Sequence, residues 1–283
     1  MLECVANVSE GRDGAVIQAL ANACGSALLD VHSDPDHHRS VFTLIGEHAG
    51  ETGAAVRNLA LAVADGVDLS GHTGAHPRFG ALDVVPFVAL GTTDQRGAVL
   101  AARDFGAWVA ETLGAPVFLY ADADPGARSL PVTRRDAFSA RLPDFGPKTP
   151  EPRLGAIAVG ARPPLVAVNV DLATHDVALA RSIADDVRER GGGLLGVRAL
   201  GFDLVSRRRA QVSMSLVDLA ATGIEAACEA VRSRTDDAGV AIAAVDVVGL
   251  IPEAEYERTS AAFRQWSGIG ADHTIEARLA ARG

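Results

Sequence analysis

The sequence predicts an α/β protein (an α+β sandwich) of two related subdomains, each a mixed sheet with helices packed on one face. Three observations lead to this fold class. Apolar runs alternate with helical patterns along the 283 residues, a chain long enough for one large core or two ordinary ones. Both halves show the order β-α-β-β-α-β, which is typical of the split βαβ (ferredoxin-like) arrangement. A segment rich in Pro, Asp, Arg and Gly separates them, and we place the subdomains at residues 1–160 and 161–283.

In the first half, apolar residues recur alternately with the period of a strand and with that of a helix. Residues 70–80 cannot be regular, because glycines and a proline punctuate them. Asp94 is a suitable cap for the helix that follows it. The predicted order is strand 2–8, helix 16–24, strands 27–31 and 40–46, helix 51–64, strand 82–90, helix 94–112 and strand 116–120.

Residues 121–152 show no sustained period, and a loop of this length in a compact domain is usually functional or disordered. We expect it to lie along the cleft between the subdomains. The second half then repeats the split βαβ order. Its predicted elements are strand 165–170, helix 175–188, strands 197–205 and 210–217, helix 220–232 and strand 240–250.

Composition and charge exclude several classes of protein. No apolar run reaches the roughly 18 residues of a membrane span, and no secretory signal is visible. The net charge of -10 argues against binding to nucleic acid or to an anionic membrane. Three widely spaced cysteines exclude a disulfide framework and fit a reducing cytoplasm. Lys148 is the only lysine among 26 basic residues, which we attribute to a codon effect unless a site explains it.

Histidines are concentrated at the start of the chain, in segments 32–39 and 72–78. Three interpretations stay open. The first is a metal site, since His72 and His76 have the spacing of a helical zinc pair, although Gly74 and Pro77 argue against a helix there. The second is that these residues only cap and form turns. The third is acid–base chemistry, because an imidazole exchanges protons near neutral pH.

His76 is the best candidate for acid–base chemistry. Pro77 fixes the backbone after it and restricts His76 itself to extended conformations, so that its side chain is presented from a stiff support. Arg78 adds a fixed cation suited to a carboxylate or a phosphate. The local pattern therefore favours a proton-transferring histidine beside an anion-binding arginine.

The chain resembles the formiminotransferase domain of the formimidoyltransferase-cyclodeaminase family and its stand-alone bacterial form, the glutamate formimidoyltransferases. The resemblance runs through most of the chain, at compatible spacings. It rests on the segments Glu3–Val5, Asn7–Gly11, Leu28–Val31, Arg39–Thr43, His76–Val84, Pro116–Tyr120, Pro143–Pro147, Gly160–Arg162, Ala210–Ser213 and Val248–Pro252.

The resemblance implies an enzyme that moves a formimidoyl group between N-formimidoyl-L-glutamate and tetrahydrofolate, with tetrahydrofolate as co-substrate and no metal. It also implies two α/β subdomains with a substrate tunnel between them. The family's catalytic histidine corresponds to His76. Its folate-binding loop corresponds to Gly146, Pro147, Lys148, Thr149, Pro150, Glu151, Pro152, Arg153, Leu154 and Gly155. Arg39 and Arg78 are candidate clamps for the carboxylates of the substrates.

Some positions depart from the family pattern. Ala75 stands where members often have Glu, and His32, His38 and Asp246 replace other polar residues; we keep His32 and Asp246 among the substrate-binding candidates. These changes leave two alternatives open. One is a related transfer that uses glycine or 5-formyltetrahydrofolate, and the other is a non-catalytic folate-binding protein. By resemblance we expect a cytoplasmic homodimer in histidine degradation, whose product could pass to a separate cyclodeaminase.

Overall fold

The structure, a computed structural model, describes residues 1–282 and divides into two compact units. The first unit is Met1–Pro163 and the second begins at Pro164, whereas the sequence placed the boundary between residues 160 and 161. Each unit holds one sheet, and the fold class predicted from the sequence is confirmed. Among residues 1–282, no helix has the length and apolar character needed to cross a membrane.

The first unit contains a sheet of six strands in the order β2-β3-β1-β4-β6-β5. The pairs among β1, β2, β3 and β4 are antiparallel, while β6 runs parallel to both β4 and β5, so this sheet is mixed. Its elements are β1 (Leu2–Val8), α1 (Gly14–Cys24), β2 (Leu28–Asp34), β3 (Arg39–Gly46), α2 (Ala49–Gly66), β4 (Leu82–Ala89), α3 (Gln95–Leu113), β5 (Val117–Ala121), α4 (Leu130–Asp136) and β6 (Ile157–Ala161).

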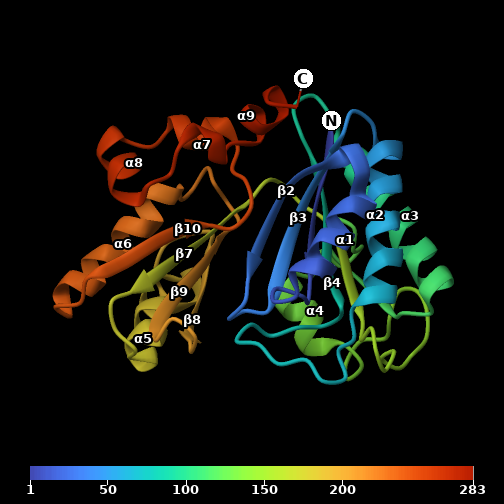
Figure 1. Cartoon of the computed structure of the whole chain (residues 1–283), viewed down its shortest axis with the longest axis horizontal. Coiled ribbons are helices and arrows are strands. Elements are labelled where there is room, and N and C mark those ends of the chain that lie inside the picture. The colour runs from blue at the N-terminus through green and yellow to red at the C-terminus, as the bar shows by residue number, and fades with distance from the viewer. Residues whose placement is uncertain (283) are drawn as a thin grey trace. The chain divides into compact units, whose positions relative to one another are not determined.

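The core of the first unit lies between one face of the sheet and the helices α1, α2 and α3, of which α2 and α3 lie side by side in Figure 1. Alternate residues of β1 show this arrangement. Cys4 and Ala6 are fully buried in that core, whereas Asn7 points to the opposite face. A small apolar cluster on the opposite face includes Tyr120 and packs against Leu130 at the start of α4.

The second unit repeats the four-stranded part of the first, in the order β10-β7-β9-β8. All of its strand pairs are antiparallel, so the mixed sheet predicted for this half is wrong in that detail. Its core lies between the sheet and α5 and α6. Its elements are β7 (Val166–Leu172), α5 (Val177–Val187), β8 (Val197–Leu204), β9 (Arg209–Leu216), α6 (Ile224–Asp237), β10 (Ile242–Val247), α7 (Glu253–Glu257), α8 (Ala261–Ser267) and α9 (Ile275–Ala280).

A β-bulge occurs at the same place in both sheets. In the first, Val8 pairs with Leu82 and Asn7 pairs with Val84, which leaves Asp83 as the extra residue on β4. In the second, Leu172 pairs with Ile242 and Asp171 pairs with Ala244, which leaves Ala243 as the extra residue on β10. A bulge re-aims side chains locally, so it marks a position where a strand can present a group outside its regular alternation.

Three features differ from the sequence-based prediction. The segment 121–152 contains a helix, α4, and is therefore not wholly irregular. The strand β6 was not predicted, because its five buried residues have no alternation, as expected for a strand between two parallel neighbours. The three short helices after residue 250 were also missed. The cysteines Cys4, Cys24 and Cys228 are free and buried.

Candidate functional site

The site is built around the irregular segment 70–80, which follows α2 and carries His76. The N–H of Ala75 donates to the carbonyl oxygen of Asp36 at 3.0 Å, which ties the segment to the turn between β2 and β3. Arg78 braces the segment from within, since its Nη2 donates to the carbonyl oxygen of His76 at 3.1 Å and its Nη1 to that of His72 at 3.5 Å. Arg78 therefore holds the backbone on which His76 stands.

The tautomer of His76 follows from its hydrogen bond. Its Nδ1 lies 2.7 Å from the carbonyl oxygen of Pro77. A carbonyl oxygen can only accept, so Nδ1 must carry the hydrogen, and in the neutral ring Nε2 then holds the lone pair. Pro77, which the sequence singled out for stiffness, thus also selects the nitrogen of His76 that can take up a proton.

The surroundings of His76 favour its neutral form. Burial and, after it, the positive charge of Arg39 lower the pKa of His76 to about 3, against the opposing effects of the hydrogen bond to Pro77 and of Asp83. The imidazole is therefore uncharged in the folded protein at neutral pH. A neutral ring with a defined tautomer is ready to act as a base.

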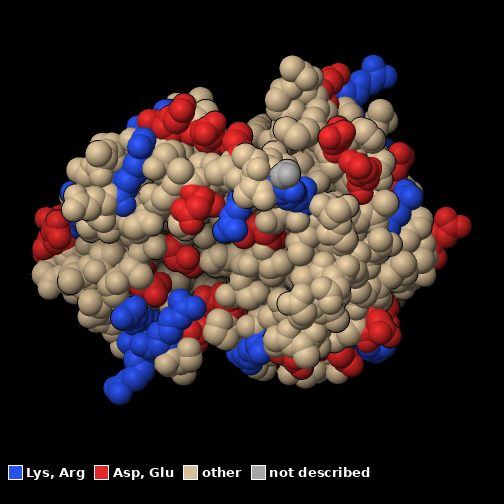
Figure 2. Space-filling view, turned by 45° about the horizontal axis from the view of Figure 1, so that its top comes forward, with Lys and Arg blue, Asp and Glu red and all other residues tan. Residues whose placement is uncertain are grey.

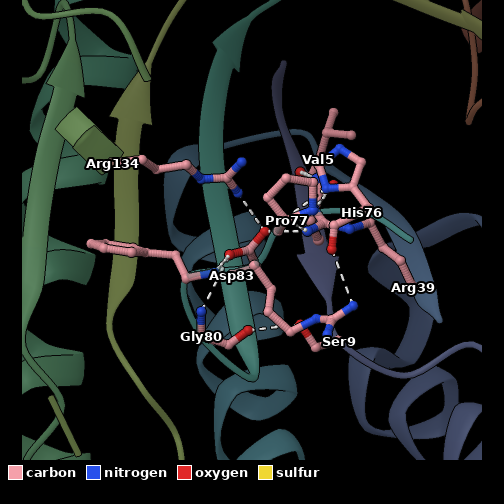
Figure 3. A network of polar contacts seen from close by, with 11 residues as sticks. Val5, Ser9, Arg39, His76, Pro77, Gly80, Asp83 and Arg134 are labelled. Carbon is pink, nitrogen blue, oxygen red and sulfur yellow. Dashed lines mark hydrogen bonds and ion pairs between the residues drawn. The ribbon is translucent and has the colours of Figure 1, made fainter. Parts of the chain in front are cut away.

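Arg39, at the start of β3, connects His76 to the sheet (Figure 3). Its Nη1 donates to Oδ1 of Asn7 at 3.0 Å. Its Nη2 donates both to the carbonyl oxygen of Pro77 at 3.1 Å and to Oδ2 of Asp83 at 2.5 Å. The carbonyl of Pro77 consequently accepts from His76 and from Arg39 together.

Asp83 stands at the bulge of β4 and is completely buried. Arg134 of α4 donates to its Oδ2 at 2.5 Å, and the N–H groups of Phe79 and Gly80 donate to its Oδ1. Burial alone would raise the pKa of Asp83, but Arg39, Arg134 and the N–H of Phe79 outweigh it and hold the pKa below its usual value. The carboxylate is therefore charged and shared by two guanidinium groups.

A second group of histidines lies beside this network. The rings of His38 and His72 are stacked with centroids 3.8 Å apart, and Nδ1 of His38 accepts from the N–H of Gly11 at 3.1 Å. Burial, followed by the charge of Arg78, lowers the pKa of His72 to about 4. Burial also lowers the pKa of His38. Throughout residues 1–282, no group of three or more His, Cys, Asp or Glu side chains is placed to hold a metal ion.

The end of the predicted folate-binding loop, residues 146–155, crosses the segment that follows His76. The N–H of Ala81 donates to the carbonyl oxygen of Leu154 at 2.9 Å, and Gly155 forms an isolated bridge with Gly80. A Cβ on Gly155, whose φ is +70°, would lie 2.5 Å from the carbonyl oxygen of Phe79. Only glycine fits this crossing, which fixes the loop to the same backbone that carries His76.

The cations of the 146–155 loop are exposed. Nε of Arg153 lies 3.5 Å from Oδ2 of Asp68, with both side chains about half exposed. Glu151 shapes the end of the loop, because its carboxylate accepts from the N–H groups of Arg153 and Leu154. Lys148 is exposed and forms no ion pair within residues 1–282.

The predicted site residues are distributed over both units, and several of them lie together in the first. His76, Arg39, Arg78 and the end of the 146–155 loop belong to one region of the first unit. His32 lies within β2, half-buried and paired with Val41. Asp246 belongs to β10 of the second unit.

Sequence reasoning missed Asp83 and Arg134 as members of the site. For Asp83 a signal existed, since a single acid inside the apolar run 82–90 needs a partner once it is buried. Nothing in the sequence indicated Arg134, because it lies on a helix that the periodicity did not reveal and its partner is 51 residues away.

Two family models match this chain. Residues 1–162 match the N-terminal subdomain of the formiminotransferase domain, and residues 167–265 match the formiminotransferase domain. Their boundary falls close to the boundary between the two units of the structure.

Curated proteins with similar sequences carry related names. A glutamate formimidoyltransferase of Thermoplasma acidophilum is 36% identical over 99% of this chain and 97% of its own length. One of Streptococcus pyogenes is 35% identical over 89% of each chain. The formimidoyltransferase-cyclodeaminase of Sus scrofa is 37% identical over 89% of this chain, which spans 50% of the pig protein.

Proposed function

Because the chain belongs to the formiminotransferase family, we propose that it is a glutamate formimidoyltransferase. It moves a formimidoyl group from N-formimidoyl-L-glutamate to N5 of tetrahydrofolate and releases L-glutamate. The family relationship supports the reaction, and the orientation and charge state of His76 support the mechanism. Tetrahydrofolate is a co-substrate that is consumed in each turnover.

His76 carries the proton transfer. Nε2 of His76 takes the proton that N5 loses as it bonds to the formimidoyl carbon, and returns it to the nitrogen of glutamate as the carbon–nitrogen bond breaks. Nitrogen N5 becomes cationic during attack and loses its proton readily, so even an imidazole whose pKa is lowered to about 3 can accept it. The hydrogen bond from Nδ1 to Pro77 keeps the accepting nitrogen on the other edge of the ring.

The substrate-binding roles follow from charge. Folate and formimidoylglutamate both end in carboxylates, which favour guanidinium and ammonium partners. Lys148 and Arg153 on the exposed 146–155 loop are suited to the folate tail, and the loop is fixed to the His76 segment at Gly155. Arg39 already donates to two side chains and a backbone carbonyl, and Arg78 donates to two backbone carbonyls, so we assign both chiefly to support of the His76 segment.

The test is formation of 5-formimidoyltetrahydrofolate from tetrahydrofolate and N-formimidoyl-L-glutamate by the purified protein. We expect His76→Ala to lower kcat by about 100- to 10,000-fold, the usual contribution of a general acid–base group. The control is His175→Ala, because His175 is half-exposed in the second unit and paired with Asp203 at 2.8 Å. A wild-type protein without product, or a fully active His76→Ala, refutes the proposal.

The same assay separates the alternatives. N-formimidoylglycine in place of N-formimidoyl-L-glutamate, and in a separate reaction 5-formyltetrahydrofolate with L-glutamate as acceptor, test the related transfers that Ala75 leaves open. Tight folate binding without turnover of either donor would instead identify a non-catalytic folate-binding protein.

The finer assignments rest on the family. We propose a cytoplasmic homodimer that acts in histidine degradation and whose product passes to a separate cyclodeaminase. The relatives that carry the cyclodeaminase name are about twice as long as this chain. On the face shown in Figure 2, acidic and basic side chains both occur, and a group of basic side chains gathers at the lower left. Sedimentation or light scattering of the purified protein tests the dimer.

A further inference from the structure

We propose that Asp83 and Arg134 are positioning residues for the proposed transfer: they hold Arg39 against the carbonyl of Pro77, and through it fix the tautomer and orientation of His76. This inference rests on the proposed function of His76. Arg134 bonds to Asp83, and Asp83 bonds to Arg39 and to the backbone of the His76 segment, so the action of both residues on the imidazole passes through Arg39 and that backbone.

Asp83 is the fixed point of the network because all of its acceptor positions are filled. Its Oδ1 accepts from the N–H groups of Phe79 and Gly80 at 2.5 and 3.2 Å, and its Oδ2 accepts from Arg39 and Arg134 at 2.5 Å each. Only a charged carboxylate offers four such positions to four donors. The bulge in β4 brings this carboxylate out of the regular alternation of the strand.

The path from Asp83 to His76 consists of two shared atoms. Nη2 of Arg39 has two hydrogens and donates to Oδ2 of Asp83 and to the carbonyl oxygen of Pro77. That carbonyl oxygen has two lone pairs and accepts from Arg39 and from Nδ1 of His76. Each atom is fully used, so a shift of Arg39 would alter the acceptor that selects the His76 tautomer.

Arg134 brings the segment 121–152 into the same network. It lies in α4, whose first residue, Leu130, packs on the cluster around Tyr120. From this helix its guanidinium group donates to Asp83 on β4. The segment continues into the 146–155 loop, which crosses the backbone beside Gly80. The acid at the bulge thus joins the His76 segment to the segment that leads to the folate loop.

The test compares Asp83→Asn with a matched control, Asp124→Asn. Asp124 is a similar acid in the same unit: it is 4% exposed, accepts from the N–H groups of Gly126 and Arg128, and pairs with the side chains of Arg128 and Arg141. It has no bond to Arg39, Pro77 or His76 within the described chain. We expect Asp83→Asn to lower kcat about 100-fold, the effect of an ångström-scale misplacement, with the KM for formimidoylglutamate changed less than threefold. Asp124→Asn should keep kcat within about threefold of wild type.

The ring ¹⁵N shifts of His76, measured by NMR with His76→Gln for assignment, provide a readout that general instability does not mimic. Wild type should show the Nδ1–H form, and Asp83→Asn a mixture of both neutral forms. If Asp83→Asn does not fold, Arg134→Gln is measured instead, with Arg134→Lys expected to restore at least half of the lost log kcat. An unchanged tautomer with unchanged kcat in the folded variants overturns the inference.

The two proposals fail in distinguishable ways. If wild type does not turn over formimidoylglutamate, the proposed function fails, while the NMR measurement still decides whether Asp83 sets the tautomer. If His76→Ala is inactive but Asp83→Asn is as active as Asp124→Asn, only the positioning role is refuted.

Discussion

The turn between β2 and β3 in the first unit and the turn between β8 and β9 in the second have the same form. Each joins its strands through four residues, and the last of these has a positive φ, 50° at His38 and 52° at Arg208. An arginine follows in both, Arg39 in the first unit and Arg209 in the second. The bulge at Asp83 is likewise matched by the bulge at Ala243.

The two units differ in where the acid lies on this shared frame. In the first, the acid is the extra residue of the bulge, and Asn7 occupies the neighbouring strand position. In the second, the bulge has Ala243 and the acid, Asp171, occupies the position equivalent to Asn7. Asp171 accepts from Gln211 at 2.8 Å, while Arg209 approaches it only to 3.9 Å. The same backbone therefore supports a tight network that reaches His76, the proposed catalytic residue, in one unit and a looser network in the other.

The largest expected effect that tests this comparison comes from the two equivalent arginines. Arg39→Ala removes a guanidinium that is 11% exposed from a carboxylate that is 0% exposed. We expect a loss of up to about 3 kcal/mol in the free energy of unfolding, at the low end for a broken buried pair because Arg134 remains. The displaced His76 should cost about 100-fold in kcat. Urea unfolding and the transfer assay measure both quantities.

Arg209→Ala is the counterpart in the second unit. Its side chain is 41% exposed at 3.9 Å from Asp171, so we expect at most about 1 kcal/mol and little change in kcat. Equal losses in the two variants would show that the position of the acid does not distinguish the units.

The next effect concerns the crossing of Gly155 and Gly80. Gly155 leads into β6, and β6 and β5 extend the first sheet beyond the four strands that it shares with the second. Gly155→Ala should destabilise the protein and raise the folate KM about tenfold, because its Cβ would lie 2.5 Å from the carbonyl oxygen of Phe79. Gly192→Ala in the second unit is the control, since its φ is +87° but nothing lies within 4 Å of the added Cβ. It should cost only the left-handed conformation, about 1–2 kcal/mol. If both variants had the same stability and the same folate KM, the crossing would have no role in folate binding.

A smaller effect is the response of the first unit to acid. The pKa of His72 is lowered from the ordinary 6.5 to about 4, mainly by burial. Between these values the unfolded chain binds a proton at His72 that the folded chain does not, so stability falls as the pH drops from 6.5 toward 4. His72→Gln should flatten this fall, as measured by urea unfolding at pH 7, 6, 5 and about 4.5. A mutant and wild type with parallel pH profiles would contradict the assignment.

Features that depend on local sequence patterns were predicted better than features that depend on contacts between distant segments. Strands such as β1 and β3 were predicted within one or two residues, because one of their faces is apolar and the alternation shows it. His76 became the candidate for acid–base chemistry because Pro77 and Arg78 adjoin it in the chain. An acid in an apolar run indicates that Asp83 needs a partner, but its place at a bulge could not be predicted, since a bulge depends on the register with β1, a strand far away in the sequence. Contacts between distant segments are absent from any local pattern.

The smallest expected effect concerns Lys148, the one lysine of the chain, for which the second unit has no counterpart. Its ammonium group is exposed on the 146–155 loop and forms no ion pair within residues 1–282, so its loss should leave the fold intact. If it contacts the folate carboxylates, Lys148→Ala removes about 0.5–1 kcal/mol of exposed ion pairing, which corresponds to a two- to fivefold rise in the folate KM at constant kcat. Lys148→Arg keeps the charge and should keep the KM. The rise should also shrink with added salt, since exposed pairs are screened. An unchanged KM in Lys148→Ala at low salt would mean that codon usage alone explains the position of this lysine, and that Arg153 is the remaining loop cation for the folate tail.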